Sequence, residues 1–204
     1  KKSIKTIYDD ILRINHHEKQ IKKFKPEIII HLASQPVVKY SYKNTKKTYL
    51  TNVMGTIELL ELVKKIDSVN QILIFTSDKV YRNLSGKILK EEENLGGLDP
   101  YSSSKSSQDI IANSYKVSFF KNSKNIIIVR AGNIIGGGDF EYSRLIPEIF
   151  LAFQKNNKIF LRNPNAIRPW QHIFDVINAL LAIIFKSSRK IENNSITFNV
   201  GPNK

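Results

Sequence analysis

Short runs of consecutive apolar residues alternate along the chain with longer amphipathic stretches. Three of these runs are Glu27–Leu32, Gln71–Phe75 and Asn125–Val129, and each is too short for a typical helix. A strand that is apolar at consecutive positions must be buried on both faces, which is typical of a parallel sheet with helices on both sides. We therefore predict an α/β fold built on a doubly wound parallel sheet.

Two stretches between the predicted strands have helical spacing. Val53–Val63 and Tyr101–Phe120 place apolar residues three and four positions apart, and Lys64 and Lys65 end the first with charges that suit a helix C-terminus. After the third strand the chain becomes rich in loops. We expect further elements at Leu145–Phe153 (helix), Val176–Phe185 (helix) and Ile196–Val200 (strand).

No glycine-rich turn precedes the first predicted strand, although parallel sheets of this kind hold a dinucleotide with such a turn. The run Gly136–Gly138 comes late and does not join a sheet strand to a helix start. Two interpretations stay open. Either the fold does not bind a dinucleotide, or the sequence begins part-way through a domain that does.

Charge and composition exclude several classes of protein. The chain has 32 basic and 18 acidic residues, a formal net charge of +14, but the lysines are scattered. Without a basic helix, zinc-finger spacing or RNA-binding motif, we predict no nucleic-acid partner. No apolar run approaches the roughly 20 residues of a membrane span, so we predict no membrane partner. The lack of cysteine agrees with a cytoplasmic location, and we expect no metal site.

Tyr101 and Lys105 are the residue pair that most suggests catalysis. They lie one helical turn apart and therefore on one face of the predicted helix. An ammonium group close to a phenol favours the phenolate, so we expect Lys105 to lower the pKa of Tyr101. The spacing alone occurs often by chance. Ser77 strengthens the catalytic interpretation of this pair, because a hydroxyl at the carboxyl end of a parallel strand points to the crevice where ligands bind.

Six motifs cover nearly the whole chain. They are Pro26–Pro36, Thr51–Thr56, Thr76–Lys79, Asp99–Lys105, Arg130–Asp139 and Arg162–His172. In this order they resemble the motifs of the extended short-chain dehydrogenase/reductase family. The resemblance implies an incomplete Rossmann-like, NAD-binding domain formed by residues 1–132 and roughly 173–201. It also implies that residues 133–172 form part of a smaller lobe that binds a sugar nucleotide.

Within this family the motifs are similar to those of nucleotide-sugar dehydratases, which implies roles for five residues. Tyr101 would be the catalytic base, Lys105 its activator, Ser77 the hydroxyl that orients the sugar, and Asp78 the acid. Lys79 stands where dehydratases of deoxythymidine-type substrates carry a glutamate, and this change indicates the CDP-sugar subgroup. We expect Lys79 to take the C5 proton as a neutral base, with stabilisation of the C5 enolate by its charge as the alternative.

The resemblance also implies binding residues. Asp10 and Ile11 resemble the turn that contacts the adenine of NAD, and Ala33 resembles the wall of the cofactor site. Tyr101 and Lys105 would complete the NAD-binding set. The residues expected to hold the sugar nucleotide are Asn133, Arg144 and Arg168.

The activity that the resemblance implies is NAD-dependent 4,6-dehydration of a nucleotide sugar. We expect CDP-glucose to become CDP-4-keto-6-deoxyglucose, with transient oxidation at C4 and return of hydride to C6. The alternatives are a sugar-nucleotide 4-epimerase of the same family, or a truncated chain without activity. The helices at Val53–Val63 and Tyr101–Phe120 resemble the pair that forms the family's dimer interface, so we expect a homodimer or higher homo-oligomer.

The resemblance further predicts what the ends of the sequence correspond to. Ser3–Tyr8 is similar to the third strand of the family's sheet. The first two strands and the glycine-rich turn would then lie upstream of Lys1, and the remaining elements of the substrate lobe would follow Pro202.

Overall fold

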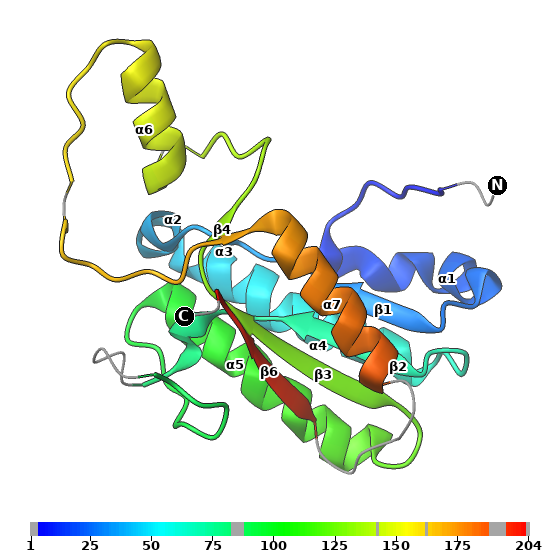
Figure 1. The fold of residues 1–204 in the computed structure, drawn as a ribbon. Helices are drawn as coiled ribbons and strands as arrows, with labels where there is room; N and C mark the ends of the chain where they lie inside the picture. Colours follow the sequence, from blue (N-terminus) through cyan, green and yellow to red (C-terminus); the bar gives the residue numbers. More distant parts are fainter. Residues whose placement is uncertain (1–3, 83–87, 142, 162, 188–194, 203–204) are drawn as a thin grey trace.

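A parallel sheet forms the centre of the molecule (Figure 1). The computed structural model describes residues 4–82, 88–141, 143–161, 163–187 and 195–202; Ser3 and Arg162, which belong to predicted motifs, lie outside these ranges. In spatial order the strands are β1 (Ile28–His31), β2 (Gln71–Phe75), β3 (Asn125–Ala131) and β6 (Ile196–Val200), all parallel. The predicted α/β parallel sheet is confirmed.

The central strands β2 and β3 are buried on both faces. Ile72 and Ile74 face one layer of helices, whereas Leu73 and Ile127 face the other. All four side chains are completely shielded from solvent. This is why the sequence is apolar at consecutive positions, since neighbouring residues of a strand point to opposite faces.

One face of the sheet is covered by helices that precede β3 in the chain. They are η1 (a 3₁₀ helix, Ile11–His17), α1 (Glu18–Phe24), α4 (Gly55–Lys64) and α5 (Pro100–Tyr115). Leu60 and Val63 of α4 are fully buried and pack with Ile72 and Ile126 of the sheet. Three short helices connect β1 to α4: α2 (Val38–Lys43), α3 (Thr45–Tyr49) and η2 (a π-helix, Leu50–Met54).

The other face is covered by α7 (Ile173–Ser187) (Figure 1). Val176, Leu180 and Ile183 of this helix pack against Leu73 of β2 and Val129 of β3. Helices on both faces make the sheet doubly wound, as the sequence predicts.

The predicted helix over Tyr101–Phe120 consists of α5 and a final π-helical segment, η4 (Lys116–Phe120). The side chain of Lys116 is buried there, and its Nζ donates to the carbonyl oxygens of Phe120 at 3.2 Å and Lys124 at 2.7 Å. Carbonyl groups at a helix C-terminus lack partners within the helix, so these bonds stabilise its end.

Between β3 and α7 the chain leaves the sheet. Short strands β4 (Ile134–Ile135) and β5 (Gln171–His172) pair in parallel, and the segment between them carries α6 (Leu145–Gln154). Figure 1 shows α6 standing away from the sheet on two extended connections.

The expected strand at Ser3–Tyr8 is wrong for its described part. Residues 4–8 have no regular structure, and Ile4 and Tyr8 are 94% and 95% exposed. A strand needs a neighbour to satisfy its backbone hydrogen bonds. Within the described ranges, no strand pairs with this stretch.

Close packing joins η1 to the start of α4. A Cβ atom added to Gly55 would lie 2.7 Å from Cγ2 of Ile11, closer than carbon atoms approach without displacement. Glycine within a helix normally costs stability relative to alanine, so its presence here reflects the contact.

We predict that Gly55→Ala lowers the free energy of unfolding by about 1–3 kcal/mol, because the added methyl group overpacks the contact. In an Ile11→Ala background the same change should be neutral or stabilise by up to about 1 kcal/mol, since the space is then open. Urea denaturation of the four proteins measures this coupling. A Gly55→Ala protein more stable than the parent would contradict the packing argument.

Candidate active site

The carboxyl ends of the strands meet at one edge of the sheet, and this edge carries the candidate site. Because the strands are parallel, the residues that follow them lie at the same edge: Ala33 after β1, Ser77 after β2 and Asn133 after β3. Ligands of open parallel sheets bind at this edge. Residues from distant parts of the sequence are thus brought to one side of the molecule.

Asp99 caps the helix that carries Tyr101 and Lys105. Its Oδ1 accepts hydrogen bonds from the backbone N–H groups of Tyr101 and Ser102, both at 3.0 Å. Pro100 occupies the first turn, where the missing N–H costs no helical hydrogen bond. The cap sets where α5 begins, so Tyr101 lies in its first turn and Lys105 lies one turn later on the same side.

Tyr101 is buried beside Ser77, with exposed fractions of 8% and 5%. Burial raises the pKa of Tyr101, because the phenolate loses hydration, and a hydrogen bond with the Ser77 side chain lowers the pKa in part. The expected net lowering of the Tyr101 pKa is therefore wrong for this structure.

The charge of Lys105 also differs from what the spacing argument assumes. Its side chain is 3% exposed, and its Nζ donates to the carbonyl oxygen of Phe75 at 3.2 Å. Burial lowers the pKa of Lys105 to about 7, so the amine is only partly charged at neutral pH. A partly charged amine stabilises a neighbouring phenolate less than the full ammonium that the spacing argument assumes.

Asp78 is partly buried at the start of η3 (Asp78–Val80). Burial raises its pKa, while a hydrogen bond with Ser77, at 3.0 Å between Oγ and Oδ1, lowers it in part. The positive charges of Lys79 and Arg168 also lower it. A carboxyl group with a raised pKa retains its proton more readily, which suits a general acid. Lys79 follows Asp78 in η3, and its Nζ lies 6.0 Å from the centre of the Tyr101 ring.

Two arginines from the segment between β3 and α7 reach this region. Arg168 acts electrostatically on Asp78, and Arg144 acts on Tyr101. Arg144 also forms an ion pair with Asp139, at 3.0 Å between Nη1 and Oδ2. Guanidinium groups suit a pyrophosphate, because their fork donates two hydrogen bonds at once.

Asn133 has a buried side-chain oxygen, Oδ1, without a hydrogen-bond partner among the described residues. Its backbone oxygen accepts a hydrogen bond from the N–H of Gln171 at 3.0 Å, which joins β4 to β5. Gly132 allows a close approach here, since a Cβ atom would lie 2.3 Å from Pro169. An unpartnered buried acceptor fits a ligand that donates a hydrogen bond.

The expected adenine-binding residues lie at the start of η1. Asp10 caps this helix, and its Oδ1 accepts from the N–H of Leu12 at 3.0 Å. Ile11 packs on Gly55, and Ala33 is exposed where the chain leaves β1. Since α1 leads to the amino end of β1, the start of η1 lies towards the carboxyl edge, on the same side as the other candidate residues.

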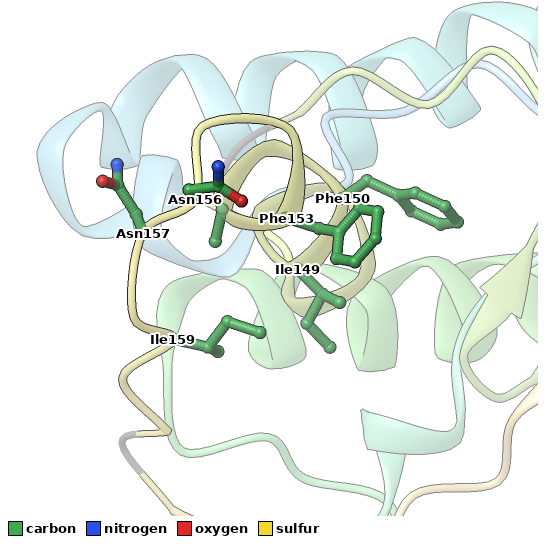
Figure 2. Close-up of a pocket in the computed structure, with 7 residues that line it drawn as sticks. Ile149, Phe150, Phe153, Asn156, Asn157 and Ile159 are labelled. Carbon is green, nitrogen blue, oxygen red and sulfur yellow. The ribbon is translucent and has the colours of Figure 1, made fainter.

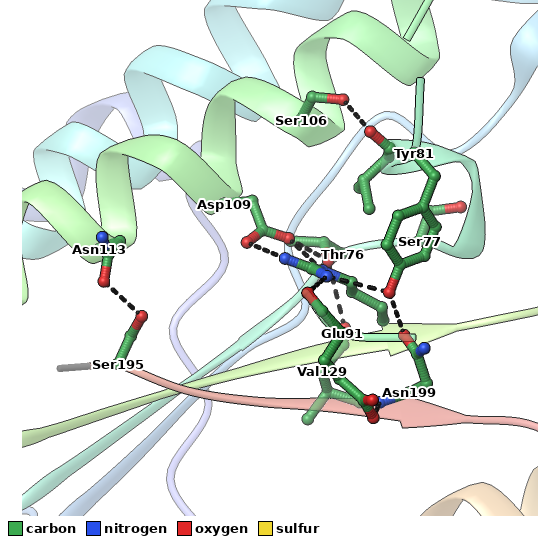
Figure 3. Close-up of polar contacts among 12 residues, drawn as sticks. Thr76, Ser77, Tyr81, Glu91, Ser106, Asp109, Asn113, Val129, Ser195 and Asn199 are labelled. Atoms are coloured by element: carbon green, nitrogen blue, oxygen red, sulfur yellow. Dashed lines mark hydrogen bonds and ion pairs between the residues drawn. The ribbon is translucent and has the colours of Figure 1, made fainter. Parts of the chain in front are cut away.

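Sequence reasoning missed a buried polar network behind the site (Figure 3). Its centre is an ion pair between Arg130 of β3 and Asp109 of α5, joined by Tyr81. A signal for it existed. Arg130 is the only charged residue of β3, and a buried strand accepts a charge only when a counter-charge lies nearby.

A second polar cluster surrounds His31, the last residue of β1. His31 is 3% exposed, and its Nε2 lies 3.0 Å from Oγ1 of Thr56. The Thr56 hydroxyl gives its proton to the carbonyl oxygen of Asn52 at 2.7 Å, so His31 Nε2 must be the donor to Thr56. Burial and the charge of Lys105 lower the pKa of His31 to about 4, so the ring is neutral at neutral pH.

An apolar pocket lies apart from these groups, on α6 and the segment after it (Figure 2). Ile149, Phe153 and Ile159 line it together with Asn156 and Asn157. None of these side chains exchanges a proton near neutral pH. The pocket therefore offers no acid or base for catalysis.

In the part of the chain that the structure describes, no helix combines the length and the apolar character needed to cross a bilayer. No group of three or more histidine, aspartate or glutamate side chains there is arranged to hold a metal ion.

Comparison with known sequences identifies related proteins. The family model described as GDP-mannose 4,6 dehydratase matches residues 1–201. CDP-glucose 4,6-dehydratase of Salmonella typhimurium is 39% identical, over 95% of this chain and 56% of that protein. UDP-glucose 4-epimerase of Mycoplasma genitalium is 26% identical, over 97% of this chain and 62% of that protein. The chain thus spans little more than half the length of these curated relatives.

Solved structures share the fold. dTDP-glucose 4,6-dehydratase from Bacillus anthracis, in complex with NAD, has a TM-score of 0.78 and 28% identity, over 97% of this chain and 58% of that one. MoeE5 in complex with UDP-glucose and NAD has a TM-score of 0.83 and 20% identity, over 99% of this chain and 64% of that one.

We predict that His31 contributes to acid sensitivity. Its pKa is about 4 in the folded chain, against about 6.5 for an unfolded histidine. The unfolded chain therefore binds more protons between these values, so the stability from neutral His31 is complete above about pH 6.5 and is lost as the pH falls to about 4. Between neutral pH and pH 4, the free energy of unfolding should fall by on the order of 2–3 kcal/mol less in His31→Gln than in the parent. Urea denaturation from pH 4 to 8 measures this difference.

The exposed His16 provides the control, because His16→Gln should keep the parent's dependence on pH. If the His31→Gln protein lost stability as steeply as the parent between pH 6.5 and 4, His31 would not be the group responsible.

Proposed function

This chain belongs to the GDP-mannose 4,6 dehydratase family, and we propose that the full-length protein is an NAD-dependent nucleotide-sugar 4,6-dehydratase that converts CDP-glucose to CDP-4-keto-6-deoxyglucose. The observation that carries the proposal is the meeting of Tyr101, Ser77 and Asp78 at the carboxyl edge of the sheet. The similarity to CDP-glucose 4,6-dehydratase supports the choice of substrate.

The residues at this edge fit NAD as the cofactor. Among the described residues, Lys105 donates one hydrogen bond, to Phe75, which leaves N–H groups for a ribose hydroxyl. The cofactor would be held by five residues, namely Asp10, Ile11, Ala33, Tyr101 and Lys105. When bound, NAD supplies a hydride acceptor at C4 of the sugar and the same hydride for C6.

The side chains of this site divide the proton transfers among them. Tyr101 accepts the proton of the C4 hydroxyl, while Ser77 orients that hydroxyl by hydrogen bonding. Asp78, whose pKa burial raises, donates a proton to the hydroxyl that leaves C6 as water. Lys79 acts on C5, by taking its proton as a neutral amine and returning a proton to C5 when hydride adds at C6, or by stabilising the enolate with its charge.

The sugar nucleotide would be held by Asn133, Arg144 and Arg168. The two guanidinium groups would neutralise the pyrophosphate, and Asn133 Oδ1 would accept a hydrogen bond from the substrate. In this proposal residues 133–172 form part of the substrate lobe, and residues 1–132 with roughly 173–201 form part of the NAD-binding domain.

Epimerisation at C4 is the alternative reaction, since one related protein is a 4-epimerase. Epimerisation needs no acid at C6. The partly buried Asp78, next to Ser77 and within the field of Arg168, therefore favours dehydration.

We also propose a homodimer or higher homo-oligomer formed through α4 and α5. Exposed apolar side chains on α5 and η4 include Ile110 (57%), Val117 (47%) and Phe119 (53%). Apolar side chains exposed at a surface favour contact with another protein surface. A cytoplasmic location is proposed as well, because the lack of cysteine agrees with a reducing compartment.

The substrate assignment predicts a defined product. With NAD, the full-length protein should convert CDP-glucose to a 4-keto-6-deoxy sugar nucleotide, observed by NMR. Tyr101→Phe is the control, because it removes the base but little volume, and should lower kcat by at least about 10²-fold. A C4 epimer as product would support the epimerase instead. Turnover of dTDP-glucose but not CDP-glucose would overturn the choice of nucleobase.

Lys79 can be tested by the exchange of the C5 proton. In Lys79→Ala, solvent deuterium should enter C5 at least about 10²-fold more slowly than in the parent, because neither a base nor a stabilising charge remains at C5. Mass spectrometry of recovered sugar nucleotide measures the exchange. Deuterium incorporation at the parental rate would exclude Lys79 from this step and make Asp78 the next candidate.

A further inference from the structure

A buried ion pair fastens α5 to the sheet behind the candidate site. Arg130 donates to both carboxylate oxygens of Asp109, from Nε to Oδ2 and from Nη2 to Oδ1, each at 2.9 Å. The two side chains are only 5% and 3% exposed. Two parallel hydrogen bonds between a guanidinium and a carboxylate fix relative orientation as well as distance.

Tyr81 extends this pair to the segment that carries Ser77. Arg130 Nη1 donates to the hydroxyl oxygen of Tyr81 at 2.9 Å and to the carbonyl oxygen of Glu91 at 2.8 Å. The Tyr81 hydroxyl in turn donates to Oδ1 of Asn199 in β6 at 2.5 Å. Figure 3 shows Tyr81 pointing towards the group that also holds Asp109. The network therefore joins α5, β3, β6 and the segment after β2.

Contacts with α5 hold the 75–81 segment both before Ser77 and after Lys79. Before Ser77, the Thr76 hydroxyl lies 3.4 Å from Oδ2 of Asp109. After Lys79, the carbonyl oxygen of Val80 accepts a hydrogen bond from Oγ of Ser106 at 2.8 Å. The segment is thus tied to α5 on each side of its functional residues.

The same network fixes the rotation of α5 about its axis. Tyr101, Lys105 and Asp109 are spaced four residues apart, so they lie along one side of the helix. A restraint on Asp109 therefore directs the other two side chains towards the 75–81 segment.

We propose that Tyr81 and Arg130 are positioning residues, which hold the 75–81 segment against α5. In this position Lys105 keeps its hydrogen bond to the carbonyl oxygen of Phe75, and Ser77 remains beside Tyr101. This inference rests on the proposed function for the roles of Tyr101 and Lys105. Neither Tyr81 nor Arg130 touches the reacting atoms.

The test removes the Tyr81 hydroxyl and leaves the buried charges paired. Tyr81→Phe in the full-length protein is compared with Tyr115→Phe, which removes the hydroxyl that donates to Oε1 of Glu61 at 2.6 Å near the other end of α5. Both changes delete one hydrogen-bonded phenol hydroxyl. Only the first touches the network.

The first readout does not depend on the substrate. NMR of lysine labelled with ¹³C at Cε follows the titration of Lys105, whose signal is identified by its loss in Lys105→Met. Lys105 acts electrostatically on the pKa of His31, and His31 is unchanged in both variants. In Tyr81→Phe we expect the pKa of Lys105 to rise from about 7 by about one unit towards its ordinary value, because a loosened segment admits water. Tyr115→Phe should leave it unchanged.

The second readout is turnover of CDP-glucose. Tyr81→Phe should lower kcat about tenfold with KM changed by less than about threefold, because alignment is lost but substrate binding is kept. If the parent does not act on CDP-glucose, the proposed function fails, and the Lys105 titration still decides the positioning role.

The proposal is overturned if Tyr81→Phe leaves both the Lys105 titration and kcat at parental values, whatever its effect on the melting temperature. If Tyr81→Phe does not fold, Ser106→Ala takes its place, since it removes the bond to Val80 without a change in charge. Its control is Ser107→Ala, which removes a bond within α5 to Ser103. Ser106→Ala should raise the pKa of Lys105, and a titration identical to that of Ser107→Ala would equally overturn the proposal.

Discussion

Arg130 carries a positive charge into the layer between the sheet and α5, and the surrounding structure compensates that charge. A buried guanidinium without partners would cost several kcal/mol. Asp109 supplies the counter-charge from α5, while Tyr81 and the Glu91 carbonyl accept the remaining contacts. Because these partners come from separate segments, the requirement to satisfy one charge fixes how the helix, two strands and a loop lie relative to one another.

Burial has opposite effects on the two central residues of the proposed site. It raises the pKa of Tyr101 and lowers that of Lys105, so each group is driven towards its neutral form. Burial thus opposes the use of Tyr101 as a base, and the Ser77 hydrogen bond acts against this effect. The position of Ser77 therefore matters chemically, which links the polar network behind the site to the proposed proton transfer.

His31, a third group that burial drives towards its neutral form, illustrates how the helices beside the site are held. Its hydrogen bond to Thr56 connects β1 to α4, and Gln108 of α5 donates to the same hydroxyl at 2.7 Å. A single threonine oxygen thus joins two helices and a strand where apolar packing alone would allow sliding. Buried polar contacts of this kind specify one arrangement more narrowly than apolar contacts, which are not directional.

Apolar spacing in the sequence determined the parallel sheet and its two covering layers, because burial on both faces leaves a local pattern. It also determined where the strands Gln71–Phe75 and Ile196–Val200 begin and end. Ser77, Tyr101 and Lys105, which the motifs name as candidates, lie at one edge of the sheet in the structure. The strand expected at Ser3–Tyr8 was wrong, because a strand depends on a neighbour that a local pattern does not reveal. The direction of the Tyr101 pKa and the pairing of Arg130 with Asp109 were decided only by the tertiary structure. Both depend on desolvation and on contacts between residues far apart in the chain, and neither quantity exists until the chain is folded.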